Sequence, residues 1–281
     1  MVRAAAAILP LIFAGVFFAQ QSVYVCPMDP DVRSNSPGVC SRCGMKLLTG
    51  VPDPVEYPTE LRLTPRPLRA GGVAQMEFLV RNPWNGRQVR SFQPVHEKLF
   101  HLFVVSQNLQ FFRHDHPVLD ADGRFRFKMA FPDAGPYRIL CDFYPDGGWP
   151  QMSAKTVIVP GAAPPLVALA RDYSAKDGAN LRVELVTDPP QPIAGVKTML
   201  FFRITPAEGL EPYLGAWGHM LAASDDLIDL IHTHPFVSDG GPQIQFNVLF
   251  PRAKTYRVWV QFQRKGVVNT AHFDVPVHAL E

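Results

Sequence analysis

The chain has 281 residues, in which 27 Lys and Arg balance 25 Asp and Glu without forming a basic run. This charge distribution argues against nucleic acid as a partner. The length suggests about two domains, and the 28 prolines, together with few amphipathic helical patterns, favour strands and turns.

The N-terminus carries the first informative pattern. One arginine is followed by an uncharged apolar run from Ala4 to Ala19. A run of this length is too short for a comfortable membrane span and is typical of a secretory signal. We therefore expect residues 1–20 to be a signal peptide or, if it is not cleaved, an N-terminal membrane anchor. The protein is expected to be exported, either periplasmic or secreted.

Residues 23–50 form a compact segment that is rich in soft metal donors. These donors are Cys26, Met28, Cys40, Cys43 and Met45. Thiolates together with thioethers suit Cu(I) or Ag(I), whereas a thioether is a poor ligand for zinc. The segment therefore predicts a Cu(I) site, with a disulfide between two of the cysteines or a zinc knuckle as the alternatives.

This segment resembles the short heavy-metal-binding domain found near the N-termini of copper and silver efflux ATPases and of periplasmic efflux adaptor proteins. The matching residues are Tyr24, Cys26, Pro27, Met28, Pro30, Val32, Pro37, Gly38, Cys40, Cys43, Gly44, Met45 and Leu47. Two positions depart from the pattern: Asp29 stands where the family often has His, and Ser41 where it often has Pro. The resemblance implies heavy-metal binding through the three cysteines, with the two methionines as further candidates. It also implies a metal efflux or transfer system as a partner.

The stretch HLFVVSQNLQFFRHDHP, residues 101–117, places three histidines in a predicted β-hairpin. Its apolar alternation is interrupted in the middle, which indicates two strands joined by a two-residue turn at residues 107–108. Counting back from that turn pairs His101 with His114, and His116 shares their face. The pattern therefore predicts three imidazoles on one patch.

The stretch HMLAASDDLIDLIHTHP, residues 219–235, repeats this pattern with the same spacing. Its histidines are His219, His232 and His234. Downstream of the first hairpin, FPDAGPYRILCDF matches FPRAKTYRVWVQF downstream of the second. An internal repeat of this length indicates two copies of one domain. Because the histidine pattern belongs to the repeated unit, chance clustering explains it poorly.

The two copies are expected to be all-β domains. Short strands divided by Gly, Pro, Asp and Asn favour β-sandwiches of the immunoglobulin-like or cupredoxin-like kind. We place the first sandwich at residues 57–160 and the second at residues 166–278, joined by the PGAAPP linker.

Three imidazoles with an open position suit Cu(I), Cu(II) or Zn(II), so each histidine trio is a candidate metal site. The structural alternative is six strand histidines that pack separately. His96 is expected at the surface or in a loop, on the face opposite to His101. Asp142 and Gln261, which occupy equivalent repeat positions, are expected to face outward, and Cys141 is expected to be an inert core thiol.

Three hypotheses about function follow from these features. The first is an exported heavy-metal protein, with copper as the favoured ion, that serves in metal buffering, resistance or transfer. The second is a copper-dependent redox enzyme built on tandem β-sandwiches, although no nucleophile elbow, phosphate loop or carboxylate pair accompanies the histidines. The third is a structural or adhesion protein in which the histidines only pack.

Overall fold

The computed structural model describes most of the chain, namely residues 24–29, 32–34, 36–49, 55–146, 148–236 and 240–280. Every regular element in these ranges is a β-strand. Within them, no helix offers the length and apolar character that crossing a membrane requires. The expected export signal at residues 1–20 lies outside the described residues and stays a prediction.

A small three-stranded sheet forms the N-terminal module. Its central strand β1 (Tyr24–Val25) pairs antiparallel with β2 (Arg33–Ser34) and β3 (Leu48–Thr49). Strands this short do not make a stable sheet alone. The loops between them, which carry the cysteines, are therefore held by side-chain packing rather than by the ladder.

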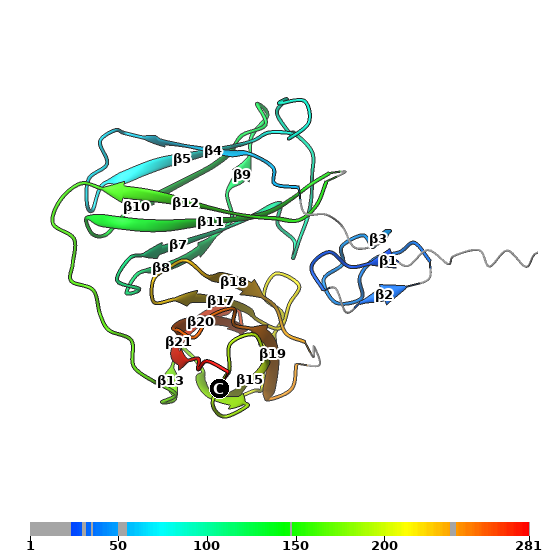
Figure 1. Cartoon of the computed structure of the whole chain (residues 1–281), viewed down its shortest axis with the longest axis vertical. Coiled ribbons are helices and arrows are strands. Elements are labelled where there is room, and N and C mark those ends of the chain that lie inside the picture. The colour runs from blue at the N-terminus through cyan, green and yellow to red at the C-terminus, as the bar shows by residue number, and fades with distance from the viewer. Residues whose placement is uncertain are drawn as a thin grey trace, which may run out of the picture.

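The first sandwich consists of two antiparallel sheets, which Figure 1 shows in its upper half. The outer sheet has the order β4 (Thr59–Thr64), β5 (Val73–Val80), β10 (Phe125–Ala130), β9 (Val118–Leu119). The inner sheet has the order β12 (Gln151–Val159), β11 (Gly135–Pro145), β7 (Phe100–Ser106), β8 (Phe112–Asp115), with β6 (Phe92–Gln93) paired to β11.

The second sandwich repeats this arrangement. Its outer sheet has the order β13 (Lys176–Asp177), β14 (Arg182–Asp188), β15 (Lys197–Thr205), β19 (Gln243–Leu249). Its inner sheet has the order β16 (Leu210–Glu211), β20 (Thr255–Arg264), β17 (His219–Ser224), β18 (Leu230–Thr233), with β21 (Val267–Pro276) paired to β20. The predicted class, all-β with two tandem sandwiches after a small cysteine module, is confirmed.

The inner strands are buried on both faces. Along β7, Leu102 and Val104 point into the core of the first sandwich. Phe103 and Val105 are one residue out of phase and join a second apolar cluster on the other face. His101 is in phase with Phe103, so it lies on that second face as well.

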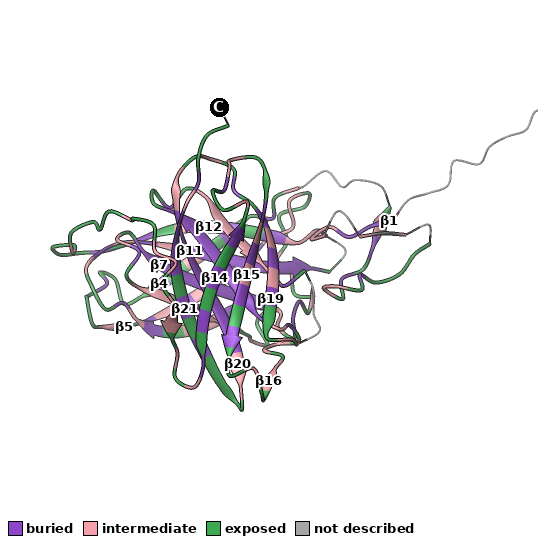
Figure 2. Cartoon of the chain, turned by 90° about the horizontal axis from the view of Figure 1, so that it is seen from below, coloured by how far each residue is buried: buried purple, intermediate pink, exposed green. Residues whose placement is uncertain are grey.

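This second cluster is the interface at which the two sandwiches meet through their inner sheets. Its buried members are Phe103, Val105, Leu109 and Leu140 from the first sandwich, and Leu221, Ala223, Leu227 and Trp259 from the second. The rings of Phe112 and Trp259 stack across it, with centroids 4.9 Å apart and planes at 10°. In Figure 2 the buried residues, in purple, accordingly gather in the strands at the middle of the molecule.

The first histidine hairpin has a four-residue loop, so the predicted two-residue turn is wrong. The Ser106 N–H donates to the Phe111 carbonyl at 3.1 Å. As a result His114 lies opposite Phe103, not opposite His101 as predicted. A shift of two residues keeps every side chain on its face, because the side-chain period of a strand is two. The predicted common face therefore survives the wrong register.

The second hairpin departs from the prediction in the same way. The Ser224 N–H donates to the Asp229 carbonyl at 3.0 Å, and His232 lies opposite Leu221. In this loop Leu227 adopts a left-handed backbone with a φ of 55°. Such a conformation is uncommon for leucine, and no glycine marks it in the sequence, which is why the shorter turn was predicted.

Candidate metal centres

The first trio, defined as His101, His114 and His116, lies where β7 meets the end of β8. His101 comes from β7 and His114 from β8, and His116 follows β8 directly before a proline. One ring nitrogen from each histidine lies within 4.8 Å of those of the other two. The structure thus brings together the three histidines that the hairpin pattern singled out.

Hydrogen bonds fix which nitrogen each ring of the first trio turns inward. The His101 Nε2–H donates to the Val95 carbonyl at 2.9 Å. The His114 Nδ1–H donates to Gln261 Oε1 at 2.7 Å. In a neutral imidazole the other nitrogen then carries a bare lone pair. The two lone pairs, on His101 Nδ1 and His114 Nε2, face each other at 3.1 Å with no proton between them.

Two acceptors at this distance repel unless a cation lies between them. The third histidine also lacks a partner for a ring nitrogen: His116 Nε2 is buried and makes no hydrogen bond among the described residues. Metal-ligating histidines commonly donate their outer N–H to a carbonyl or carboxylate, which orients the ring and makes the inner nitrogen more basic. The first trio therefore fits a metal ion better than it fits hydrogen bonding within the protein.

The second trio, defined as His219, His232 and His234, has the same convergence within 4.8 Å. The His219 Nε2–H donates to the Tyr213 carbonyl at 2.8 Å, so its Nδ1 lone pair faces His234 Nε2 at 3.1 Å. The His232 Nδ1–H donates to the Asp142 carboxylate at 2.6 Å. This leaves His232 Nε2 buried and without a hydrogen-bond partner among the described residues.

The two trios form one histidine cluster across the interface between the sandwiches. The ring centroids of His114 and His219 are 5.6 Å apart. His114 is held by Gln261 of the second sandwich, and His232 is held by Asp142 of the first. Each sandwich thus orients a candidate ligand of the other, so His114 and His232 have their hydrogen-bond partners only when the sandwiches are docked.

Burial lowers the pKa values of five of these histidines, and neighbouring imidazoles lower them further. The pKa of His101 falls to about 4 and that of His116 to about 3. The pKa values of His114, His219 and His234 lie well below the ordinary value for the same reasons. These rings are therefore neutral at pH 7, as metal ligands must be, and protons compete for them only in more acidic solution.

His96 also belongs to the cluster: it lies in a loop, one of its two expected places, but it is buried and not at the surface. It is only 8% exposed, and its ring centroid lies 3.6 Å from that of His234 and 5.4 Å from that of His219. It was placed on the opposite face by counting along an unbroken strand, but β7 begins only at Phe100 and a loop precedes it. Burial lowers the pKa of His96 to about 3.

Asp142 and Gln261 are residues of the candidate site that sequence reasoning missed. They do face away from the core of their own sandwich, as expected, but the other sandwich covers that face and leaves them 3% and 7% exposed. Burial alone would raise the pKa of the Asp142 carboxyl, but the hydrogen bond from His232 and the neighbouring imidazoles together outweigh it and hold that pKa below its ordinary value. The sequence did contain a signal for them: both are polar, they occupy equivalent positions in the two repeats, and each lies directly opposite the first histidine of a trio, Asp142 opposite His101 and Gln261 opposite His219.

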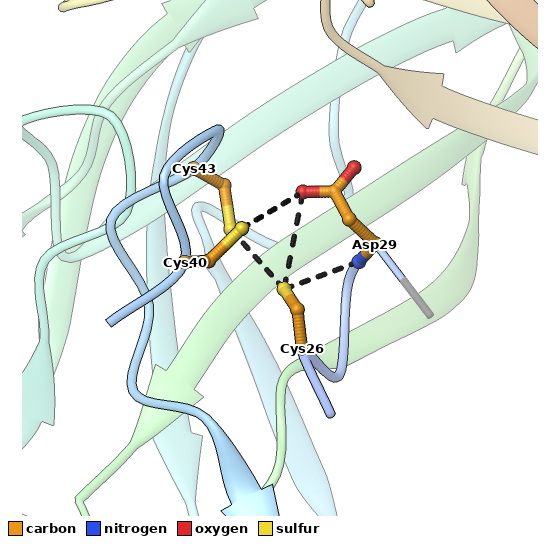
Figure 3. Close-up of side chains that lie close together, drawn as sticks. All are labelled: Cys26, Asp29, Cys40 and Cys43. Carbon is orange, nitrogen blue, oxygen red and sulfur yellow. Dashed lines mark hydrogen bonds between the residues drawn. The ribbon is translucent and has the colours of Figure 1, made fainter. Parts of the chain in front are cut away.

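The cysteine module gathers a third group of donors, shown in Figure 3. The Cys26 and Cys43 sulfurs are 3.5 Å apart, and Asp29 Oδ2 lies 3.5 Å from the Cys40 sulfur. An ion pair with Arg42 at 3.1 Å holds the other oxygen of Asp29. The three cysteines are free thiols, which corrects the disulfide alternative. The residue that replaces the family's histidine therefore supplies the fourth donor.

One of these thiols is ready to bind a cation at neutral pH. The hydrogen bond from Cys43 lowers the pKa of Cys26 to about 6, and the backbone N–H of Asp29 adds to this effect. Burial raises the pKa of Cys40, and the hydrogen bond to Cys26 together with burial raises that of Cys43. Metal binding would therefore displace protons chiefly from these last two thiols.

The module docks beside the histidine cluster. Its apolar cluster includes Met45, fully buried, and Met28, partly buried, together with Val95 and Tyr144 of the first sandwich. Val95 is also the residue whose carbonyl orients His101. A ligand role for the two methionines stays a prediction.

Asp29→Asn should separate the preferences of the module for hard and soft ions. An amide oxygen is a weaker donor to a divalent ion than a carboxylate, whereas Cu(I) depends mainly on the thiolates. We expect Zn(II) affinity to fall by roughly tenfold or more and Cu(I) affinity to change little. Competition titrations with a chromophoric chelator measure both, and an equal loss for the two ions would contradict a ligand role for Asp29.

The fold and these sites define a class: a tandem β-sandwich protein with an N-terminal heavy-metal-binding domain. The heavy metal binding domain model matches residues 23–48, which confirms the resemblance. The model described as Domain of unknown function (DUF8832) matches residues 55–159 and again residues 174–279. These matches cover most of the chain, which therefore belongs to the DUF8832 family.

Solved structures with similar architecture include adhesins and fibronectin type III segments. A Ca²⁺-stabilised ice-binding adhesin of an Antarctic bacterium is 9% identical with a TM-score of 0.27, and the match covers 81% of this chain but only 50% of the adhesin. The Escherichia coli adhesin FdeC is 14% identical (TM-score 0.27; 83% and 70% covered), and a two-domain segment of chicken tenascin is 9% identical (TM-score 0.24; 79% and 99% covered). No curated protein matches the chain.

Proposed function

We propose that this protein is an exported copper-binding protein that buffers copper or passes it on, with the ion as its cargo. The observation that carries the proposal is the pair of buried histidine trios. In four of these histidines, the ring N–H that points away from the trio donates to an oxygen of another residue; they are His101, His114, His219 and His232. Within each trio, one ring nitrogen from each histidine converges on the others. The heavy-metal-binding domain adds a second kind of site in the same chain.

Copper is the ion that suits both kinds of site. Among divalent first-row ions, nitrogen and sulfur sites bind Cu(II) most tightly, and thiolates also select Cu(I). We therefore assign Cu(I) to the module and Cu(I) or Cu(II) to the trios, with Zn(II) as the weaker competitor at each. The cysteine group and the two trios give a capacity of three ions.

Transfer between the two kinds of site is supported by a cavity of about 460 Å³ that they share. Met28 and Asp29 of the module line it together with His234 of the second trio. Arg42 also lines it and stacks over the Phe236 ring at 4.5 Å. An ion that leaves the cysteine group through this cavity would reach a histidine ligand without first diffusing away from the protein.

Export is the part of the proposal that depends on residues 1–20. Their apolar run predicts a secretory signal, and a metal efflux or transfer system in the same compartment would supply or accept the ion. Thiols bound to a metal ion would also be protected from oxidation there.

The proposal is tested by producing the full chain in Gram-negative cells grown with added copper and separating periplasm from cytosol. We expect the chain in the periplasmic or membrane fraction, with copper bound in the purified protein. A double substitution, His114→Ala with His232→Ala, should reduce the copper content, while His278→Ala, an exposed residue outside the cluster, should not. Metal-free protein after such growth, or protein confined to the cytosol, would contradict the proposal.

A further inference from the structure

The two trios share a sequence pattern but differ in the charge of the group that holds their middle ring. His232 donates its Nδ1–H to the Asp142 carboxylate at 2.6 Å, and His114 donates to the Gln261 amide oxygen at 2.7 Å. Asp142 lies on β11 and Gln261 on β20, the strands that correspond in the two repeats. A carboxylate and a neutral amide therefore occupy the same place in two sites built on the same hairpin pattern.

We infer that this difference makes the two sites unequal: the second trio takes a divalent cation first and tightly, and the first trio takes its ion second and favours a monovalent one. The inference rests on the proposed metal binding at the trios. It adds the order of filling, the charge preference of each site and the two positioning residues that set them.

The carboxylate acts through the ring that it holds. An acceptor with a full negative charge makes the inner nitrogen of His232 more electron-rich, so that nitrogen is a stronger ligand than its counterpart on His114. The side chains of His232 and Asp142 are 0% and 4% exposed, so water screens the charge of Asp142 from the bound ion only weakly. Loss of such a partner typically lowers metal affinity by roughly 10- to 100-fold.

The short distance between the trios strengthens this asymmetry. Rings of His114 and His219, one from each trio, have centroids only 5.6 Å apart at the buried interface. A divalent ion in the second trio therefore repels the next cation to enter, and it repels a monovalent ion half as strongly as a divalent one. Gln261, which holds His114, is neutral and adds no charge of its own to offset this repulsion. The Asp142 carboxylate lies on the strand next to His101, but its hydrogen bond goes to His232 of the second trio.

The experiment first eliminates the cysteine site of the module and then changes the charge of the residue that holds the middle histidine of each trio. In the full chain carrying Cys26→Ser, Cys40→Ser and Cys43→Ser, Cu(II) is titrated in steps while its electron paramagnetic resonance spectrum is recorded. We expect two binding steps whose affinities differ by roughly 10- to 100-fold. Asp142→Asn should weaken the first step by that factor and change the nitrogen hyperfine pattern of its signal. Gln261→Glu should strengthen the second step.

Both substitutions preserve the shape of the side chain, and far-UV circular dichroism checks that the variants fold. Because the two substitutions are expected to act in opposite directions, a general loss of structure cannot imitate the result. Two steps of equal affinity that neither substitution changes would overturn the inference and leave the proposed function standing. Failure of the parent chain to bind copper in either oxidation state would overturn the proposed metal binding at the trios, and this inference with it.

Discussion

Lowering the pH from 7 to 4.5 should decrease the free energy of unfolding of the metal-free protein by several kcal/mol. A histidine whose pKa is lower in the folded than in the unfolded state stabilises the fold fully above the unfolded value of about 6.5. That contribution is lost as the pH falls toward the folded-state value, because the unfolded chain then binds more protons. For His101, a pKa of about 4 corresponds to a loss on the order of 3 kcal/mol. The same direction holds for His116, His96, His114, His219 and His234.

Urea unfolding followed by far-UV circular dichroism at a series of pH values measures this loss. His101→Gln should reduce it, because glutamine is neutral at every pH, whereas His278→Gln, at an exposed position, should leave it unchanged. Copper-loaded protein should be more stable than metal-free protein at each pH above about 5, since a ligand that binds only the folded state stabilises it. An unfolding free energy that is constant between pH 7 and 4.5 would show that the rings are not buried as described.

Replacing Cys26, Cys40 and Cys43 by serine should abolish tight Cu(I) binding by the module and leave the trios able to bind copper. Serine hydroxyls are hard, weakly acidic donors, so the loss of three thiolates should lower Cu(I) affinity by roughly a thousandfold or more. Competition against a chromophoric Cu(I) chelator measures the change. The number of ions bound should fall by one, and the Cu(II) sites should remain.

Cys141 provides the matched control for this experiment. It is fully buried in the core of the first sandwich, and burial raises its pKa, as expected of an inert thiol. Cys141→Ala should therefore lower the stability of the protein without changing Cu(I) affinity or stoichiometry. A triple serine variant that binds Cu(I) as tightly as the wild type would show that the module only braces the fold.

The sequence was sufficient for features that depend on local periodicity and repetition. The period of two along each strand placed His101, His114 and His116 on one face even though the register was off by two residues. The repetition of the pattern identified two tandem domains, and the Cys-Pro-Met and Cys-x-x-Cys-Gly-Met spacing identified the heavy-metal-binding domain. The turn type escaped prediction because it relies on a leucine in the left-handed region.

Features that depend on how the parts dock could not be predicted in this way. Alternation marks Asp142 and Gln261 as facing away from their own core, but it does not say that a second sandwich covers that face. The same docking brings His96 from a loop of the first sandwich against His234 of the second. Asp29 departs from the family pattern and is not among the predicted donors, yet the fold of the module places its carboxylate beside the cysteine sulfurs.

The central claim is that metal ions bind in the histidine cluster between the two sandwiches. Anomalous diffraction at the copper edge, from crystals of the copper-loaded full chain, tests it most directly. We expect one anomalous peak against the inward nitrogens of each trio and a further peak among the cysteine sulfurs of the module. Copper peaks elsewhere on the protein, with none inside either trio, would contradict the account.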